Sequence, residues 1–323
     1  MADGACDLSI VIPVYCELES LPELYRRLTS VMDGLAARTS YEILFVNDGS
    51  SDGTAELLRA MARADSRVKA LTLSRNFGHQ KAITAGLDWC VGRAVVVMDA
   101  DLQDPPELIP DMLAHWREGS HVVFAVRRRR DGESFIRTAC IRMFYQFSQL
   151  LTDTYIPPNA GDFRLLDRRV IDALKELREE DRYLRGLIAW VGFHQSSVVY
   201  DRPSRFAGHS KYPLHRLLRL AFDGIAGFSN RPLRLASFLG LGVTMLSLGL
   251  IIWVIVAHLL SPQSAAPWGW ASLMVAILFI GGVQLLCVGL LGEYIGRIFN
   301  QTKHRPLYLI AEKIGFEEDG RRT

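Results

Sequence analysis

Two aspartates, Asp99 and Asp101, stand one residue apart at the end of a short apolar run, residues 94–98. Side chains two positions apart on an extended chain project from the same face, so these two carboxylates can share one hard divalent cation. An Asp-x-Asp pair is more often a solvated turn. Here, however, the preceding run is typical of a buried strand, and Gln103 and Asp104 follow closely enough to support the same ion. The pattern therefore favours a Mg²⁺ or Mn²⁺ site that would hold a diphosphate.

Polar residues also follow three earlier apolar runs. They occupy Pro13–Glu17, Asn47–Asp52 and Ser74–Lys81. No G-x-G-x-x-G follows the first run and no G-x-x-x-x-G-K-[ST] occurs, so neither a dinucleotide-binding fingerprint nor a P-loop explains the site. Asp48 and Asp52 also suit an Asx turn or a helix cap, and both roles can hold together.

The elements that must position these residues alternate along the N-terminal part of the chain. Runs rich in Val, Ile and Leu, typical of buried strands, cover residues 8–15, 41–48, 68–74, 94–101 and 121–127. Amphipathic stretches with helical spacing cover residues 21–35, 54–64 and 79–91. This alternation predicts an α/β fold with a mostly parallel sheet, which binds ligands at the carboxyl ends of its strands. The polar loops are therefore expected to converge on one edge.

Charge and cysteine content exclude other classes. The 323 residues include 37 Lys and Arg against 35 Asp and Glu, a net charge of +2 that provides no drive towards nucleic acid. The five cysteines are scattered without a zinc or iron–sulfur spacing and are interpreted as reduced thiols of a cytosol-facing protein. A lone histidine is more often structural than a ligand, so His79 and His194 receive no catalytic role at this point.

The C-terminal part has the composition of a membrane segment. No Asp, Glu, Lys or Arg occurs between Arg234 and Glu293. Residues 235–260 and 268–291 are each longer than the roughly 20 residues that span a bilayer. Basic residues flank the pair on both outer sides and the connecting turn is uncharged, which predicts a hairpin with both flanks in the cytoplasm. Two buried helices of a soluble protein are the less favoured alternative, because such helices rarely lack a polar face at this length.

A basic stretch precedes the first span. Its cationic residues are Arg202, Arg205, His209, Lys211, His215, Arg216 and Arg219. They suit a lipid phosphate, although Arg216 and Arg219 equally suit general attraction to anionic headgroups. Residues 134–151 have the pattern of a helix in the membrane interface or of an oligomer contact. Arg127 leaves the fifth strand towards the site, whereas a run such as Arg127–Arg130 is usually a solvated face.

Longer motifs resemble one family. They are IVIPVYCELESLPEL, EILFVNDGSSDGT, SRNFGHQKAITAGL, VVVMDADLQDPPELIP, NAGDFRLLDRRV and RFAGHSKY, followed by a two-span segment ending in LLGEYIGRIF. These motifs resemble the family 2, GT-A-fold polyprenyl-phosphate glycosyltransferases, in particular the bacterial undecaprenyl-phosphate glucosyltransferases that modify O-antigen. Dolichyl-phosphate mannose synthases are related.

The resemblance also implies a domain order. A GT-A domain covers residues 1–210, with the interfacial helix inside it. A juxtamembrane helix follows at 211–234, the transmembrane hairpin at 235–292 and a cytoplasmic tail at 293–323.

The resemblance implies roles for individual residues. Nucleotide-sugar binding is expected of Pro13, Tyr15, Glu17, Asp48, Lys81, Asp99, Asp101, Gln103 and Arg127. Within that set, Asp99, Asp101 and Gln103 match the metal site. Arg205, Ser210 and Lys211 match the segment that binds the acceptor phosphate, and Asp162 and Asp101 are the expected catalytic residues. Cys16 departs from the family, which commonly has Asn there.

The chemistry implied is one inverting displacement. An oxygen of undecaprenyl phosphate attacks the anomeric carbon of a UDP-sugar, and UDP leaves as the metal neutralises its charge. A phosphate is already largely ionised near neutral pH, so Asp162 is expected to orient or stabilise rather than to act as a base. UDP-glucose is the leading donor, with GDP-mannose as the alternative.

Two rival functions are less favoured by the sequence. A processive synthase is not favoured, because no Gln-x-x-Arg-Trp motif occurs, and a scaffold that binds nucleotide sugars without turnover is the non-enzymatic alternative. The resemblance implies a multi-pass protein of the bacterial inner membrane with its catalytic domain and termini in the cytoplasm. It also implies contact with membrane lipids, a homo-oligomer such as a tetramer, and a separate flippase.

Overall fold

The computed structural model describes residues 6–36, 39–127, 160–180, 182–200 and 269–316, together with single positions between 238 and 256. The chain divides into two compact units. The first comprises residues 1–146, 154–213 and 305–323, and the second comprises residues 147–153 and 214–304. The expected interfacial helix at 134–151 and the basic residues 202–219 lie outside the described residues.

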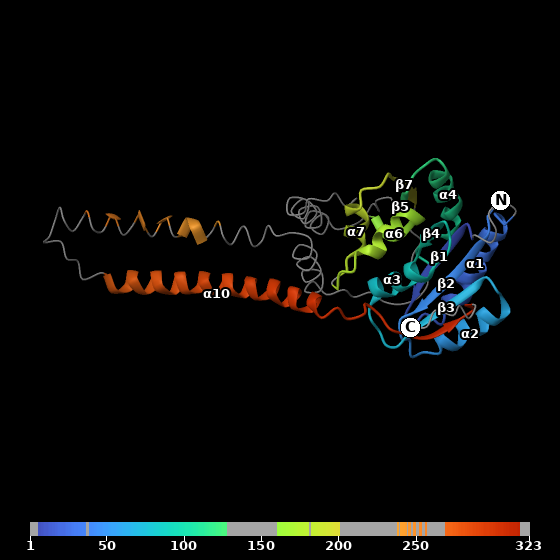
Figure 1. Cartoon of the computed structure of the whole chain (residues 1–323), viewed down its shortest axis with the longest axis horizontal. Helices are drawn as coiled ribbons and strands as arrows, with labels where there is room; N and C mark the ends of the chain where they lie inside the picture. The colour runs from blue at the N-terminus through green and yellow to red at the C-terminus, as the bar shows by residue number, and fades with distance from the viewer. Residues whose placement is uncertain are drawn as a thin grey trace, which may run out of the picture. The chain divides into compact units, whose positions relative to one another are not determined.

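An eight-stranded sheet forms the centre of the first unit, in the order β7-β5-β6-β4-β1-β2-β3-β8 (Figure 1). The strands are β1 (Leu8–Val14), β2 (Tyr41–Asn47), β3 (Val68–Leu73), β4 (Ala94–Val97), β5 (Val122–Arg127), β6 (Ala160–Asp167), β7 (Gln195–Tyr200) and β8 (Ile310–Ile314). Strands β4, β1, β2 and β3 run parallel, whereas β6 and β8 run antiparallel to their neighbours. The expected mostly parallel α/β sheet is confirmed.

Helices cover this sheet because its central strands are apolar throughout. Every residue of β1 and β2 is buried, as a strand covered on both faces requires. The helices are α1 (Leu21–Asp33), α2 (Thr54–Ala64), α3 (His79–Trp89), α4 (Ile109–Arg117), α6 (Arg168–Glu176) and α7 (Leu184–Trp190), with a 3₁₀ turn at Pro106–Leu108. The three helices expected from the sequence are confirmed to within two residues at their ends.

Helix α3 packs directly on β1 and β2. Gly86 allows this approach, because a Cβ at that position would overlap Val11 Cγ1 and lie 3.2 Å from Val46 Cγ2. Six consecutive residues of α3, Ala82 to Leu87, are buried. The first turn of this helix is thereby fixed relative to the strand ends of β1 and β2.

Strand β8 adds the C-terminal residues to the sheet. It pairs antiparallel with β3, and the Arg59 guanidinium donates to both carboxylate oxygens of Glu312 at 2.8–3.1 Å. Phe316 packs edge-on against Trp89 of α3, with ring centroids 5.7 Å apart. The chain after the last helix therefore returns to the same sheet that carries the strand-end carboxylates.

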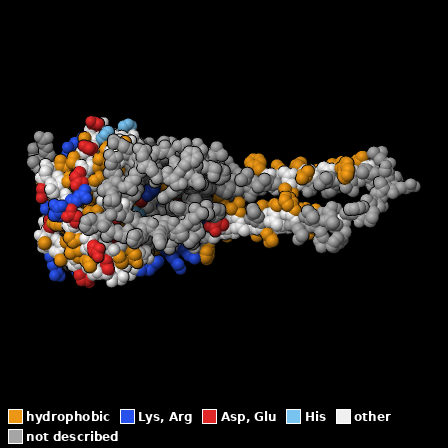
Figure 2. Space-filling model, turned by 180° about the vertical axis from the view of Figure 1, so that it is seen from behind, with side chains coloured by type: hydrophobic (Ala, Val, Ile, Leu, Met, Phe, Trp, Pro, Cys, Tyr) orange, Lys and Arg blue, Asp and Glu red, His pale blue; other side chains and the backbone are white. Residues whose placement is uncertain are grey.

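The second unit contains a long apolar helix, α10 (Gly269–Thr302). Its segment Phe279–Thr302 is the one candidate membrane span among the described residues, with a mean hydropathy of 1.5. Large apolar side chains such as Leu285, Ile295 and Phe299 are exposed along it. Figure 2 shows hydrophobic side chains, in orange, on the surface of this unit. Such a surface suits lipid rather than water. Single described positions within 235–260 are helical, and the complete hairpin stays a prediction.

Replacement of Gly86 by alanine should test how α3 is seated. The added methyl group must displace Val11 or move the helix, and overpacking of this kind costs about 1–3 kcal/mol. The unfolding midpoint of the full-length protein in detergent should fall accordingly. Gly34→Ala is the matched control, because Gly34 ends α1 at a φ of −65° that alanine accepts. Equal midpoints for the two variants would contradict the tight seating of α3.

Candidate active site

Asp48 joins the end of β2 to the loop before α3. Its Oδ1 accepts a hydrogen bond from the Phe77 backbone N–H at 2.7 Å, and its Oδ2 accepts one from Gly78 at 2.9 Å. The side chain is buried, and burial raises the pKa of Asp48 despite these two hydrogen bonds. Gly49 has a φ of 70°, and a Cβ there would lie 2.6 Å from the Arg75 carbonyl carbon. Asp48 and Gly49 therefore fix the loop that delivers the first turn of α3.

The loop after β4 is held by its own carboxylates. Asp104 is buried; its Oδ2 accepts from the Asp99 backbone N–H at 3.1 Å, and its Oδ1 accepts from the Tyr200 hydroxyl at 3.2 Å. Asp101 Oδ1 accepts from the Gln103 backbone N–H at 3.1 Å, around a left-handed Leu102 with a φ of 63°. These contacts keep Asp99 and Asp101 at the carboxyl end of the strand, where the sequence predicted them.

Asp99 carries the oxygen best suited to a cation. Its Oδ1 is buried and accepts no hydrogen bond. Burial raises the pKa of Asp99, and the negative charges of Asp162 and Asp101 add to that rise against the opposing charge of His79. Among the described residues no three Asp, Glu, His or Cys side chains gather to hold a metal ion. One or two carboxylates completed by substrate phosphates are the usual protein share of a Mg²⁺ site, so this donor set fits such an ion.

His79 lies between two carboxylates, although the sequence analysis gave it no role. Its Nε2 is 3.5 Å from Asp99 Oδ1 and 3.4 Å from Asp162 Oδ2. Desolvation acts to lower the pKa of His79, but the contacts with Asp162 and Asp99 outweigh it and raise that pKa. The signal that would have found His79 is its place at the start of the helix that follows β3. His194, by contrast, contributes its backbone carbonyl to the amides of His121 and Val122.

Asp162 lies on β6 in an arginine-rich setting. Its Oδ1 accepts from Arg164 Nη2 at 2.8 Å and from Arg185 Nε at 2.9 Å, while its Oδ2 accepts from Arg185 Nη2 at 2.9 Å. Burial opposes ionisation, yet the hydrogen bonds from His79 and Arg185 and the charge of Arg164 hold the pKa of Asp162 well below its usual range. Asp162 is therefore a carboxylate at neutral pH. Sequence reasoning found Asp162 but missed both arginines.

The other predicted residues are distributed around this edge. Pro13 is buried in β1, Tyr15 is exposed after it, and Glu17 accepts from the Ser20 hydroxyl at 2.7 Å. Lys81 pairs with Glu180 at 3.0 Å, Gln103 is buried, and Arg127 is the last residue of β5. Cys16 has a left-handed φ of 54° and donates its backbone N–H to Ser50 Oγ. Arg205, Ser210 and Lys211 lie outside the described residues.

Comparisons with known families identify the class. Residues 9–175 match the family described as Glycosyl transferase family 2, and residues 231–298 match the one described as GtrB C-terminal hairpin. The sheet and this match together confirm the expected GT-A type of fold. The chain belongs to glycosyl transferase family 2.

Relatives match this chain over nearly its full length. An uncharacterized glycosyltransferase, YkcC, of Bacillus subtilis (strain 168) is 49% identical, covering 96% of this chain and 94% of that protein. The bactoprenol glucosyl transferase of Shigella phage SfV is 39% identical, covering 95% of this chain and 98% of that protein. Among solved structures, glucosyl-3-phosphoglycerate synthase from Mycobacterium tuberculosis gives a TM-score of 0.45 at 19% identity, covering 68% of this chain and 78% of that one.

The ion pairs of Asp162 predict a pH-dependent loss of stability. Asp162→Asn leaves the buried Arg164 without its carboxylate, and breaking a buried pair in this way costs about 3–5 kcal/mol. The pKa of Asp162 is lowered in the folded state relative to about 3.9 in the unfolded chain. The ionised Asp162 therefore contributes its full stabilisation of the folded state above pH ~4, and this stabilisation is lost as the pH falls through the folded-state pKa.

Unfolding midpoints of wild type and variant at several pH values check this expectation. The difference in unfolding midpoint between wild type and Asp162→Asn should be largest at pH ~7 and should become smaller below pH ~4. Glu23→Gln serves as control, since Glu23 and its partner Arg26 are both exposed and a surface pair contributes at most about 1 kcal/mol. A difference that stays constant down to pH ~2 would rule out the lowered pKa assigned to Asp162.

Proposed function

We propose that this protein transfers glucose from UDP-glucose to a polyprenyl phosphate, which in bacteria is undecaprenyl phosphate, with inversion at the anomeric carbon. The observation that carries the proposal is the match to a bactoprenol glucosyl transferase, which extends over 95% of this chain and so includes both the catalytic unit and the apolar C-terminal helix. A lipid-linked acceptor requires both parts, because the reacting phosphate lies at a membrane surface.

Asp99 and Asp101 would hold Mg²⁺ or Mn²⁺, with Gln103 beside them, and the bound ion would neutralise the charge of the departing diphosphate. The buried Asp99 Oδ1, which accepts no hydrogen bond and lies 3.5 Å from His79 Nε2, supports this assignment. Pro13, Tyr15, Glu17 and Asp48 would surround the base and ribose, with Lys81 and Arg127 as further candidates. Arg205, Ser210 and Lys211 would bind the acceptor phosphate.

The displacement forms one bond and breaks one. An oxygen of the lipid phosphate bonds to the anomeric carbon while the bond from that carbon to the β-phosphate oxygen breaks, and its electron pair leaves with UDP. Since a phosphate monoester is largely ionised near neutral pH, no protein base is needed. The low pKa of Asp162 and its hydrogen bonds from two arginines support a role in orienting or stabilising groups instead.

A transfer assay tests this function. Purified protein should move radiolabelled glucose from UDP-glucose to undecaprenyl phosphate with Mg²⁺ or Mn²⁺, and EDTA should abolish transfer. Asp99→Asn and Asp101→Asn should each lower kcat/KM by at least the roughly 10- to 100-fold typical of groups that support a metal site. Asp111→Asn, an exposed position on α4, is the matched control. Transfer from GDP-mannose but not from UDP-glucose would identify GDP-mannose as the donor. Tight UDP binding without transfer from any donor would favour a scaffold that binds nucleotide sugars.

We further propose that residues 235–260 and 268–291 form a hairpin with both flanks in the cytoplasm. A cysteine placed by Ser264→Cys between the spans should react with a membrane-impermeant maleimide in intact cells. Lys303→Cys, just after α10, should react only after permeabilisation. The exposed native Cys16 provides the internal control for the catalytic unit. Labelling of Lys303→Cys in intact cells would contradict this topology.

A further inference from the structure

Asp162 pairs with two arginines, although one would be enough to neutralise its charge. Arg164 is buried, with 2% of its side chain exposed, and donates both to Asp162 Oδ1 and to the Gly161 carbonyl oxygen at 2.8 Å. That contact already compensates the buried carboxylate. Arg185 then adds a second full positive charge to the same group. The three side chains together leave one net positive charge beside Asp99.

Arg185 differs from Arg164 in its exposure and support. One third of its side chain, 33%, is accessible. It projects from α7, whose neighbouring residues Leu184, Leu187 and Ile188 are buried. The Leu184 backbone N–H donates to Gln80 Oε1 on α3 at 3.1 Å, next to His79. The backbone and the guanidinium of Arg185 are thus both anchored at the site, while its side chain stays within reach of a ligand.

We propose that Arg185 binds a phosphate group of the reacting substrates and that Asp162 is the positioning residue that aims its guanidinium. This inference rests on the proposed function, because both substrates of that reaction present phosphate oxygens. A guanidinium carries five N–H donors in a planar fork, and arginine recognises phosphate through two parallel hydrogen bonds. Asp162 accepts from Nε and Nη2, which fixes the plane of the fork. The phosphate is either that of the donor diphosphate or that of the lipid acceptor.

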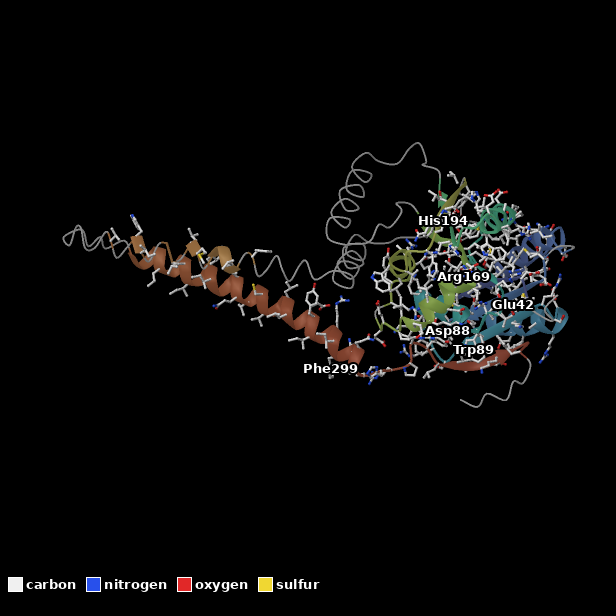
Figure 3. All side chains as sticks on the ribbon, turned by 45° about the horizontal axis from the view of Figure 1, so that its top comes forward. Glu42, Asp88, Trp89, Arg169, His194 and Phe299 are labelled. Carbon is white, nitrogen blue, oxygen red and sulfur yellow. The ribbon has the colours of Figure 1, made fainter. Side chains whose placement is uncertain are left out.

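The chain offers a matched ion pair for comparison. Arg178 donates to both oxygens of Asp88 at 2.8 Å and 3.0 Å, and Asp88 lies beside Trp89 at the C-terminal end of α3 (Figure 3). Both pairs are bidentate, although Arg178 donates through Nη1 and Nη2 and Arg185 donates through Nε and Nη2. If the second arginine on Asp162 were only a structural ion pair, Arg185→Gln and Arg178→Gln should have the same consequences.

The experiment uses the full-length protein in detergent with Mn²⁺. Calorimetry measures the affinities for UDP and for uridine, and steady-state kinetics measures KM for UDP-glucose and for undecaprenyl phosphate. Arg185→Gln should lower the affinity for UDP or raise the KM for undecaprenyl phosphate by about 10- to 100-fold, which is the range for the loss of a hydrogen bond to a charged group. Arg185→Lys, which keeps the charge but loses the fork, should lie between wild type and Arg185→Gln.

The two phosphate sources give different results. Weaker UDP binding with unchanged uridine binding assigns Arg185 to the donor diphosphate. Unchanged UDP binding with a raised KM for undecaprenyl phosphate assigns it to the acceptor. In either case Asp162→Asn should change the same quantity in the same direction, by lowering the affinity for UDP or by raising the KM for undecaprenyl phosphate. It should add little to that change in an Arg185→Gln background, because the two residues would act as a unit.

Two outcomes would overturn this inference alone. One is an Arg185→Gln variant that matches Arg178→Gln in every affinity and in both KM values while the wild type transfers glucose. The other is full additivity of Asp162→Asn and Arg185→Gln, which would remove the positioning role of Asp162. A wild-type protein that transfers no glucose to undecaprenyl phosphate would instead overturn the proposed function. UDP and uridine affinities would still show whether Arg185 contacts a diphosphate.

Discussion

The geometry of the site depends on one buried carboxylate, that of Asp48. Each of its oxygens accepts a backbone N–H from the loop before α3, so the end of β2 determines where that helix begins. The position of the helix is also fixed by close packing, since Gly86 allows it to contact β1 and β2 directly. His79 in its first turn and Asp88 in its last are both engaged by charged partners. A shift of α3 would therefore disturb contacts at both of its ends.

Asp99 and Asp162 lie close to the same histidine, yet their surroundings give them opposite properties. Asp99 has a buried oxygen without a hydrogen bond and a raised pKa, so its ionised form would be stabilised by a nearby cation. Asp162 is surrounded by donors and has a strongly lowered pKa, which makes it a fixed anion. Negative charge at the site is thus divided between Asp99, the proposed metal ligand, and Asp162, which is paired with two arginines.

Much of the catalytic fold could be predicted from the sequence because hydrophobic runs of four to eight residues, here those of β1 to β5, report buried parallel strands directly. The carboxylates at their ends follow from the same pattern. His79, Arg164 and Arg185 could not be assigned in this way, since their importance comes from contacts between α3, β6 and α7 that are distant in sequence. Strand β8 is short, and its two consecutive charged residues, Glu312 and Lys313, interrupt any apolar pattern, so its pairing with β3 leaves little local signal.

Asp162, the expected catalytic carboxylate, is not suited to act as a base, and a phosphate acceptor explains why it need not be. An alcohol nucleophile would require a carboxylate or imidazole able to take a proton near neutral pH. Asp162 does not meet that requirement, because its pKa is far below neutrality. An ionised phosphate needs no such base. Its approach is instead opposed by electrostatic repulsion from the diphosphate leaving group and from the carboxylates nearby. Positive charge beside the reacting groups reduces that repulsion, and Arg185, whose guanidinium is held by Asp162, is the proposed source of that charge.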